Sequence, residues 1–146
     1  MLNYPVDIID STQGFTIQFV DVPEAITYGE TLEEALENAV DCIDTAVEFY
    51  YEEKRAIPMP SSADGRYTVS PSPLVELKIV LHNEMLAQNV SKAEMARRLK
   101  IAPPNFERVI DLRHKTKLET INSAFAALGK RLQINVVQAD QACNPA

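Results

Sequence analysis

The sequence has few cysteines, few glycines and no long apolar run, and each scarcity excludes a class of protein. Its two cysteines, Cys42 and Cys143, have no CxxC or Cys/His companion, so we expect no disulfide, metal site or thiol chemistry. The four glycines form no phosphate-cradling loop, and we expect no cofactor. No apolar stretch approaches the roughly 20 residues of a membrane-spanning helix. The N-terminus also lacks the pattern of a signal peptide, which predicts a cytoplasmic protein.

Charge is distributed unevenly along the 146 residues. Residues 1–70 hold 14 acidic residues against three basic ones, a net charge of −11, whereas residues 71–146 hold 11 basic against seven acidic, a net charge of +4. The overall charge of −7 argues against nucleic acid as a partner, but the division favours two modules with different partners. The alternative is that both halves carry ordinary solvated charged faces.

The first 30 residues show the two-residue alternation of β-strands. Apolar residues alternate over 4–9 and again over 15–20, and the turn-rich segment 10–14 between them ends in Gly14, a residue open to positive φ. This pattern predicts a β-hairpin. Residues 25–28 can add a third short strand, and residues 67–70 a later one.

A long amphipathic helix is predicted after Thr31. Thr31 and Glu34 have the spacing of a capping box, and apolar residues then recur at steps of three and four up to Tyr50. Segment 57–60 contains two prolines and stops the helix. Its polar face is acidic and consists of Glu33, Glu37, Asp41, Asp44, Glu48 and Glu52. Strands on one side of a single helix make a small layer that buries one apolar face.

Pro71-Ser72-Pro73 marks the predicted boundary between two modules, because paired prolines break regular structure. The remainder predicts helices over 74–88, 92–99, 104–112 and 118–128, followed by a strand over 132–136. We therefore expect an α+β protein with a sheet-plus-helix module over 1–70, an all-α module with a C-terminal strand over 71–138, and a disordered tail over 139–146.

The second and third of these helices have the pattern of a helix-turn-helix. Ser91 and Glu94 predict a second capping box, Ile101-Ala102 a brief turn, and Pro103-Pro104 the start of the next helix. Lys100 occupies a turn position that is often glycine. The turn must therefore accommodate a side chain, and a positive φ at Lys100 is one backbone conformation to expect there.

In that geometry the start of the later helix enters the major groove of DNA. Asn105 and Arg108 are the candidates for base edges, and Pro104 for apolar contact with a thymine methyl. The candidates for phosphate contact are Ser91, Lys92, Lys100, Arg113, Lys115 and Lys117. The alternatives are that Arg108 pairs with Glu107 or Glu94 on the surface, and that Ser91 is only a helix cap.

These motifs, in this order, resemble the HicB family of bacterial and phage antitoxins over nearly all of residues 3–137. The segments that carry the resemblance are 4–6, 14–25, 29–35, 49–52 and 57–60 in the first module, and 94–99 and 114–118 in the second. The resemblance implies a partial ribonuclease-H-like fold for the first module and a helix-turn-helix for the second.

The resemblance also implies a partner, the HicA toxin, a small protein that cleaves messenger RNA using a histidine. By this resemblance we expect the antitoxin to cover the toxin's active surface and the complex to bind the operator of their own operon. A toxin that grips RNA presents basic surface, so we expect the toxin-binding residues to be Glu33, Glu37, Asp41 and Asp44. The alternative is that this acidic face only keeps the helix soluble.

Two other functions stay open at this stage. A metal-dependent nuclease is one, with Asp7 and either Glu33 or Glu37 as conceivable carboxylate ligands. Residues 67–70 supply no further carboxylate, and no serine or cysteine nucleophile is patterned around His82 or His114. We therefore expect no enzyme. A stand-alone regulator with a sensor module is the other. For the DNA-binding case we expect a homodimer or higher homo-oligomer through residues 120–128 and 132–137 of the C-terminal module, because specific repressors pair two such motifs.

Overall fold

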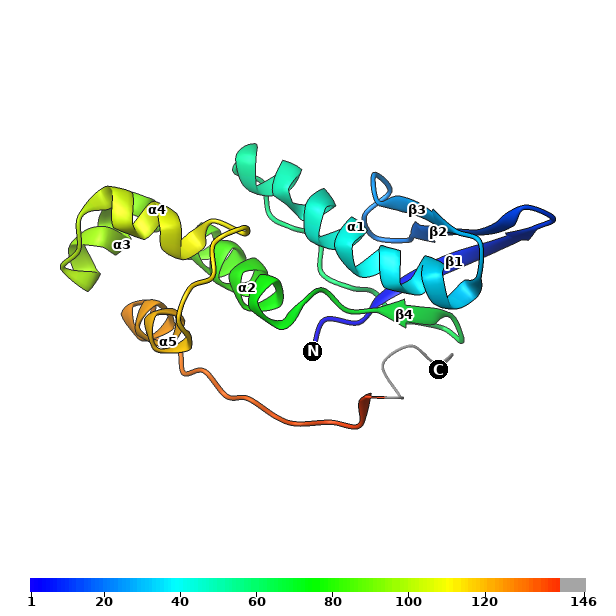
Figure 1. Ribbon diagram of the computed structural model, residues 1–146. Helices are drawn as coiled ribbons and strands as arrows, with labels where there is room; N and C mark the ends of the chain where they lie inside the picture. Colours follow the sequence, from blue (N-terminus) through cyan, green and yellow to red (C-terminus); the bar gives the residue numbers. More distant parts are fainter. Residues whose placement is uncertain (140–146) are drawn as a thin grey trace.

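The protein is an α+β structure, and the computed structural model describes residues 1–139 (Figure 1). Its elements are β1 (Tyr4–Ser11), β2 (Gly14–Phe19), β3 (Ile26–Gly29), α1 (Leu32–Glu52), β4 (Tyr67–Val69), α2 (Pro73–Ala87), α3 (Lys92–Leu99), α4 (Pro103–Ile110) and α5 (Leu118–Ala127). Where the sequence predicted both ends of one of these elements, the observed ends lie within two residues of the predicted ones. None of the helices in this part of the chain is long and apolar enough to cross a membrane.

The four strands form one antiparallel sheet in the order β3-β2-β1-β4. β1 and β2 form the predicted hairpin, with Ser11 opposite Gly14 and a two-residue loop between them. Gly14 has φ +141°, and a Cβ there would lie 2.5 Å from the carbonyl oxygen of Gly29, so only glycine fits this position.

α1 lies across one face of the sheet (Figure 1). Its predicted apolar stripe is buried, and it packs on the inward side chains of β1 and β2, such as Val6 and Ile17. Gly29 makes the close approach possible, since a Cβ there would lie 2.3 Å from the backbone nitrogen of Ala35. The opposite face of the sheet stays exposed at Ile9 and Ile26.

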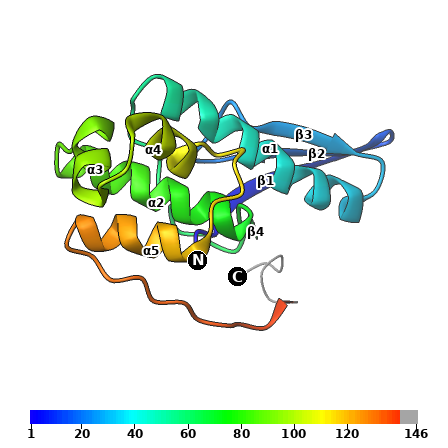
Figure 2. The same ribbon diagram turned by 60° about the vertical axis from the view of Figure 1, so that its left-hand side comes forward.

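α2 connects the two halves of the molecule. Its first part contributes Val75 and Ile79 to the core under the sheet, and its second part contributes Leu81 and Met85 to a second core shared with α3, α4 and α5. Figure 2 shows α2 between α4 and α5. The sheet module and the helical module are thus held together by a shared helix as well as joined in sequence.

Both predicted capping boxes form only in part. Thr31 and Ser91 accept a hydrogen bond from the backbone amide three residues later, as predicted. The glutamates do not return to the cap residue: Glu34 accepts from the amide of Glu30, and the Glu94 carboxylate pairs with two arginines of its own helix. Neighbouring cations offer Glu94 a charge-assisted bond, which is stronger than one to a neutral amide.

The strand predicted over 132–136 is wrong for the chain as described. Residues 131–138 form no strand, and Ile134 and Val136 are 59% and 98% exposed. A strand requires a hydrogen-bonded neighbour, and nothing in residues 1–139 supplies one to this segment. The predicted tail lies outside the described residues, apart from Ala139.

Candidate nucleic-acid and protein interfaces

α3 and α4 are two short helices joined by three residues, and they pack against each other through small and apolar side chains. Met95 and Ala96 of α3 are buried against Phe106 and Ile110 of α4. The small side chain of Ala96 lets the two helices approach. α5 packs on α3 and closes the other side of this core.

The turn between them depends on Lys100. This residue caps α3 in the left-handed region, with φ +57° and ψ +42°, the conformation considered from sequence alone. Its backbone amide donates to the carbonyl of Arg97, and the amide of Ile101 donates to that of Ala96. The lysine side chain is exposed.

The start of α4 presents its polar side chains to solvent. Pro104, Asn105 and Arg108 are all exposed, whereas Phe106 and Val109 face the core. Both surface partners considered for Arg108 are occupied elsewhere: Glu94 binds Arg97 and Arg98, and Glu107 binds Lys92. Among residues 1–139 Arg108 forms no ion pair, so its guanidinium stays available.

The ammonium group of Lys92 is covered on one side by two other side chains. Its ammonium group lies 3.0 Å from a carboxylate oxygen of Glu107 and 4.9 Å from the ring centroid of Tyr51. Ser91, the cap residue before it, accepts from the amide of Glu94. A phosphate contact by Lys92 stays a prediction, and it requires sharing this cation with Glu107.

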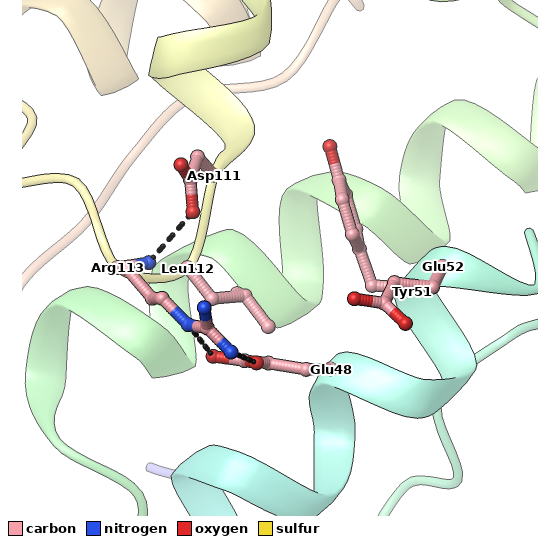
Figure 3. A pocket seen from close by; sticks show the side chains of 6 residues that line it. All are labelled: Glu48, Tyr51, Glu52, Asp111, Leu112 and Arg113. Atoms are coloured by element: carbon pink, nitrogen blue, oxygen red, sulfur yellow. Dashed lines mark hydrogen bonds and ion pairs between the residues drawn. The ribbon is translucent and has the colours of Figure 1, made fainter.

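Arg113 forms a bidentate ion pair with Glu48 of α1 (Figure 3). Its Nε and Nη2 donate to the two carboxylate oxygens at 2.9 and 2.5 Å, and its backbone amide donates to the Asp111 side chain at 2.9 Å. These side chains border a cavity of about 230 Å³ between the two modules. Lys115 and Lys117, by contrast, are exposed and form no ion pair in the described chain.

The acidic face of α1 divides into two parts. Glu33, Glu37 and Asp41 are exposed and without ion pairs in the part of the chain that the structure describes. Asp44 instead accepts from the amide and the hydroxyl of Ser72, at 3.2 and 2.6 Å, and burial raises its pKa. Of the four predicted toxin-binding carboxylates, Glu33, Glu37 and Asp41 are therefore free to meet a partner, whereas Asp44 is occupied.

Sequence reasoning missed Lys78, which is the one buried lysine among residues 1–139. It is fully buried in α2, and its ammonium group donates to the backbone carbonyls of Asp111 and His114. Burial lowers its pKa. The signal was its spacing, because Leu74, Lys78, Leu81 and Met85 form one helical stripe that is otherwise apolar.

A second missed contact ties α2 to the segment after α1. The amide side chain of Asn83 accepts from the amide of Ile57 and donates to its carbonyl, both at 2.8 Å. The buried ring of His82 hydrogen-bonds the Arg55 carbonyl at 2.8 Å and contacts the Tyr51 ring at a tilt of 53°, with the ring centroids 5.1 Å apart. No sequence pattern indicated this pairing, since the partners are 26 and 27 residues apart.

The carboxylates considered for a nuclease do not converge. Asp7 points to the exposed face of the sheet and pairs with Arg66 at 2.8 Å, while Glu33 and Glu37 belong to the helix that covers the other face. Within residues 1–139, no group of three or more histidine, cysteine or carboxylate side chains is arranged to hold a metal ion.

Comparisons with known proteins assign the family. Residues 3–80 match the HicB-like antitoxins of bacterial toxin–antitoxin systems. The chain is 41% identical to Antitoxin HicB 2 of Photorhabdus laumondii over 133 residues, which covers 91% of this chain and 95% of that protein. It is 37% identical to Antitoxin HicB of Escherichia coli over 138 residues, 93% of this chain and all of the relative. Antitoxin HicB of Pseudomonas fluorescens shares 32% over 138 residues, 93% and 94% of the two chains.

The chain therefore belongs to the HicB-like antitoxin family. Members of this family are regulatory proteins and not enzymes, and a toxin is the partner that the family implies.

Proposed function

We propose that this antitoxin neutralises a HicA-type mRNA-cleaving toxin through residues 1–70 and represses its own operon by binding operator DNA through residues 71–138, in the cytoplasm. The observation that carries the proposal is the separation of unpaired charge. Free carboxylates lie on α1, whereas Lys100, Arg108, Lys115 and Lys117 surround α3 and α4 without ion pairs in residues 1–139. Opposite charges on opposite modules suit one basic protein and one polyanion.

For DNA, α4 is the proposed recognition helix of a helix-turn-helix. Its exposed first turns carry Asn105 and Arg108, whose side chains match the hydrogen-bonding edges of adenine and guanine. Lys115 and Lys117 follow within a few residues and are placed for the phosphates that flank the groove. Residues 1–70 then form the partial ribonuclease-H-like module of the family.

One such motif covers only a few base pairs, so we propose a homodimer that places two copies of α4 about 34–36 Å apart. The proposed contacts are α5 and segment 132–137. Two observations support this choice: the segment alternates Leu132, Ile134 and Val136, and nothing in residues 1–139 covers the side chains of Ile134 and Val136.

Operator binding is tested by fluorescence anisotropy of the purified chain on its own promoter duplex and on a scrambled duplex. We expect tighter binding to the promoter and an affinity that falls steeply with salt, because bound cations displace condensed counterions. Equal affinity for both duplexes would contradict a repressor. If neither duplex is bound in a salt-sensitive way, the proposed DNA-binding function is wrong.

Toxin binding is tested with the small basic protein encoded beside this chain, made with its catalytic histidine replaced. Reversing two charges, Glu37→Lys with Asp41→Lys, is expected to weaken toxin binding and to spare DNA binding, because both residues are exposed on α1. Reversing Asp10 and Asp64 to lysine is the control for general charge, because both carboxylates are exposed, lie outside α1 and form no ion pair in residues 1–139. Unchanged toxin affinity in the α1 variant would show that another face is used.

A stand-alone regulator with a sensor module is the second candidate, favoured by one observation. A cavity of about 370 Å³ lies between the modules and is lined by Tyr51, His82, Met85, Lys92 and Ile110 among others. Native mass spectrometry of the chain purified from its own cells separates the two functions. A bound small molecule would favour the sensor, whereas a basic protein partner favours the antitoxin.

A further inference from the structure

A groove of about 430 Å³ lies between α1 and the edge strand β3 and is open to solvent. Glu24, in the loop before β3, and Thr27 form one wall. The other wall comes from the second half of α1, where Asp41, Cys42 and Phe49 face the groove. Glu33 and Glu37 do not line it.

Side chains of α1 already cover the edge of β3 along this groove. Asn38 donates to the carbonyl of Tyr28 at 3.0 Å, and the sulfur of Cys42 accepts from the backbone of Ile26. These contacts occupy backbone groups that an added strand would need. A partner is therefore expected to bind here with its side chains and not by extending the sheet.

The groove carries negative charge that nothing in residues 1–139 neutralises. Neither Glu24 nor Asp41 forms an ion pair in that range. The pKa of Glu24 is lowered, chiefly by a hydrogen bond from its own backbone and then by one from the Tyr50 hydroxyl, so this carboxylate is ionised at neutral pH. The nearby cation, Arg55, is held by Glu53 at 2.8 Å and lies over the ring of Tyr50.

An aromatic ring stands at the rim of this acidic groove. Phe49 lies outside the buried stripe of α1, and 59% of its surface is exposed. A single exposed phenylalanine is ordinary on a protein surface, but beside carboxylates its ring face is open to a cation that the carboxylates attract. A ring face together with two carboxylates is the combination that suits a guanidinium group, which stacks on aromatic rings and forms charge-assisted hydrogen bonds.

We propose that this groove receives an arginine side chain of the partner toxin, with Phe49 as its stacking surface and Glu24 and Asp41 as its acceptors. The inference rests on the proposed toxin binding and adds where and how the toxin is held. Glu33 and Glu37, one side of the helix away, then contribute long-range attraction and little direct contact.

Two variants with the same loss of charge test the location. Glu24→Gln with Asp41→Asn removes the two groove carboxylates, and Asp10→Asn with Asp64→Asn removes two exposed carboxylates that lie outside the groove and outside α1. We expect the groove variant to bind the catalytically inactive toxin about 10- to 100-fold more weakly by calorimetry, and the control variant to change by less than about threefold.

Phe49 tests the stacking. Phe49→Leu keeps an apolar side chain and loses the aromatic face, so binding is expected to weaken by about 2- to 30-fold, the range of a cation–π contact. Because the side chain is exposed, both Phe49→Leu and Phe49→Ala are expected to unfold at the temperature of the wild type, which thermal denaturation checks.

Cys42 reports directly on occupancy, because its thiol lines the groove. In a Cys143→Ser background, labelling by a small maleimide at pH 8.5 is measured alone and with saturating inactive toxin. We expect at least about tenfold slower labelling in the complex, as the groove is filled. Slow labelling without toxin that depends on chain concentration would assign the groove to a second copy and overturn the proposal.

The remaining outcomes separate this inference from the function on which it rests. If the wild type binds toxin but the groove variants keep its affinity within about twofold and Cys42 stays reactive, the groove is not the contact and the antitoxin function stands. If the wild type binds no toxin, both are overturned.

Discussion

The buried ammonium group of Lys78 donates hydrogen bonds to the carbonyl oxygens of Asp111, at the end of α4, and of His114, at 2.5 and 2.6 Å. One side chain of α2 thereby sets the path of the connection between α4 and α5. The same connection carries Arg113, which pairs with Glu48 of α1. The position of the proposed recognition helix relative to the sheet module thus depends on contacts from two other helices.

Lys78→Met is expected to lower the free energy of unfolding by about 1–3 kcal/mol, because it keeps the apolar stem but removes two hydrogen bonds from a charged donor, while the backbone amides of His114 and Thr116 still donate to the same carbonyls. Urea unfolding followed by circular dichroism measures this. Lys130→Met, an exposed lysine 3.5 Å from Glu84, is the control and should cost less than about 0.5 kcal/mol. Equal stabilities of the two variants would refute a structural role for Lys78.

Arg108→Ala is expected to reduce the preference for operator over scrambled DNA by about 1–3 kcal/mol, the range for loss of a bidentate contact to guanine. The reason is its free guanidinium on the exposed side of α4. Anisotropy titrations at fixed salt on both duplexes give the preference. Toxin binding should not change, and a uniform loss on both duplexes would make Arg108 a phosphate contact.

Arg113 and Lys115 are expected to differ in their effect on DNA binding, although only one residue separates them. Lys115→Ala should lower affinity on every duplex and reduce the slope of log K against log salt by about one. Arg113→Ala should change that slope much less, because Glu48 already neutralises the guanidinium. Salt titrations of both variants decide this, and equal slopes would mean that the Arg113 pair opens on DNA.

Stability is expected to fall as the pH drops below 6.5, in part because of His82. Burial lowers the pKa of this imidazole, so between its folded pKa and 6.5 the unfolded chain binds the additional proton and folding is disfavoured. Above 6.5 this contribution is absent. Urea midpoints at pH 5, 6, 7 and 8 should therefore fall less steeply toward acid for His82→Gln than for the wild type. A parallel pair of curves would exclude His82 as the cause.

A chain that ends at Lys130 is expected to be monomeric at micromolar concentration, whereas the full chain is expected to be a dimer. The truncation removes the uncovered segment 131–137 and none of the residues that fill the second core, except the partly buried Leu132. Light scattering coupled to size exclusion measures both. A full chain that is already a monomer would refute the proposed homodimer.

Much of the fold was predictable because its signals are local. Alternation gave the hairpin, the three-and-four spacing gave α1, and the prolines at 71, 73, 103 and 104 marked where helices begin. Even the left-handed conformation of Lys100 was considered from its place in a short turn. The exception is the strand predicted over 132–136. An alternating pattern shows that a segment can pair as a strand, but pairing also requires a neighbouring strand, which the pattern does not provide.

The candidate surfaces were less predictable, because availability depends on distant partners. Residue type alone made Lys92, Arg113 and Asp44 as suitable as Arg108 and Glu37 for binding. Their pairing with Glu107, Glu48 and Ser72 is visible only after residues 15 to 65 positions apart in the sequence have come together. The groove beside Phe49 likewise exists only because α1 lies along β3.

The amino-acid order by itself determined the elements, the segregation of charge and the family, since periodicity, capping and motif succession are properties of neighbouring residues. The tertiary structure decided which charges are free, which are consumed in holding the modules together, and that Lys78 belongs to the core. The physical reason is that ion pairs and buried hydrogen bonds act over a few ångströms, so they are set by packing and not by distance along the chain.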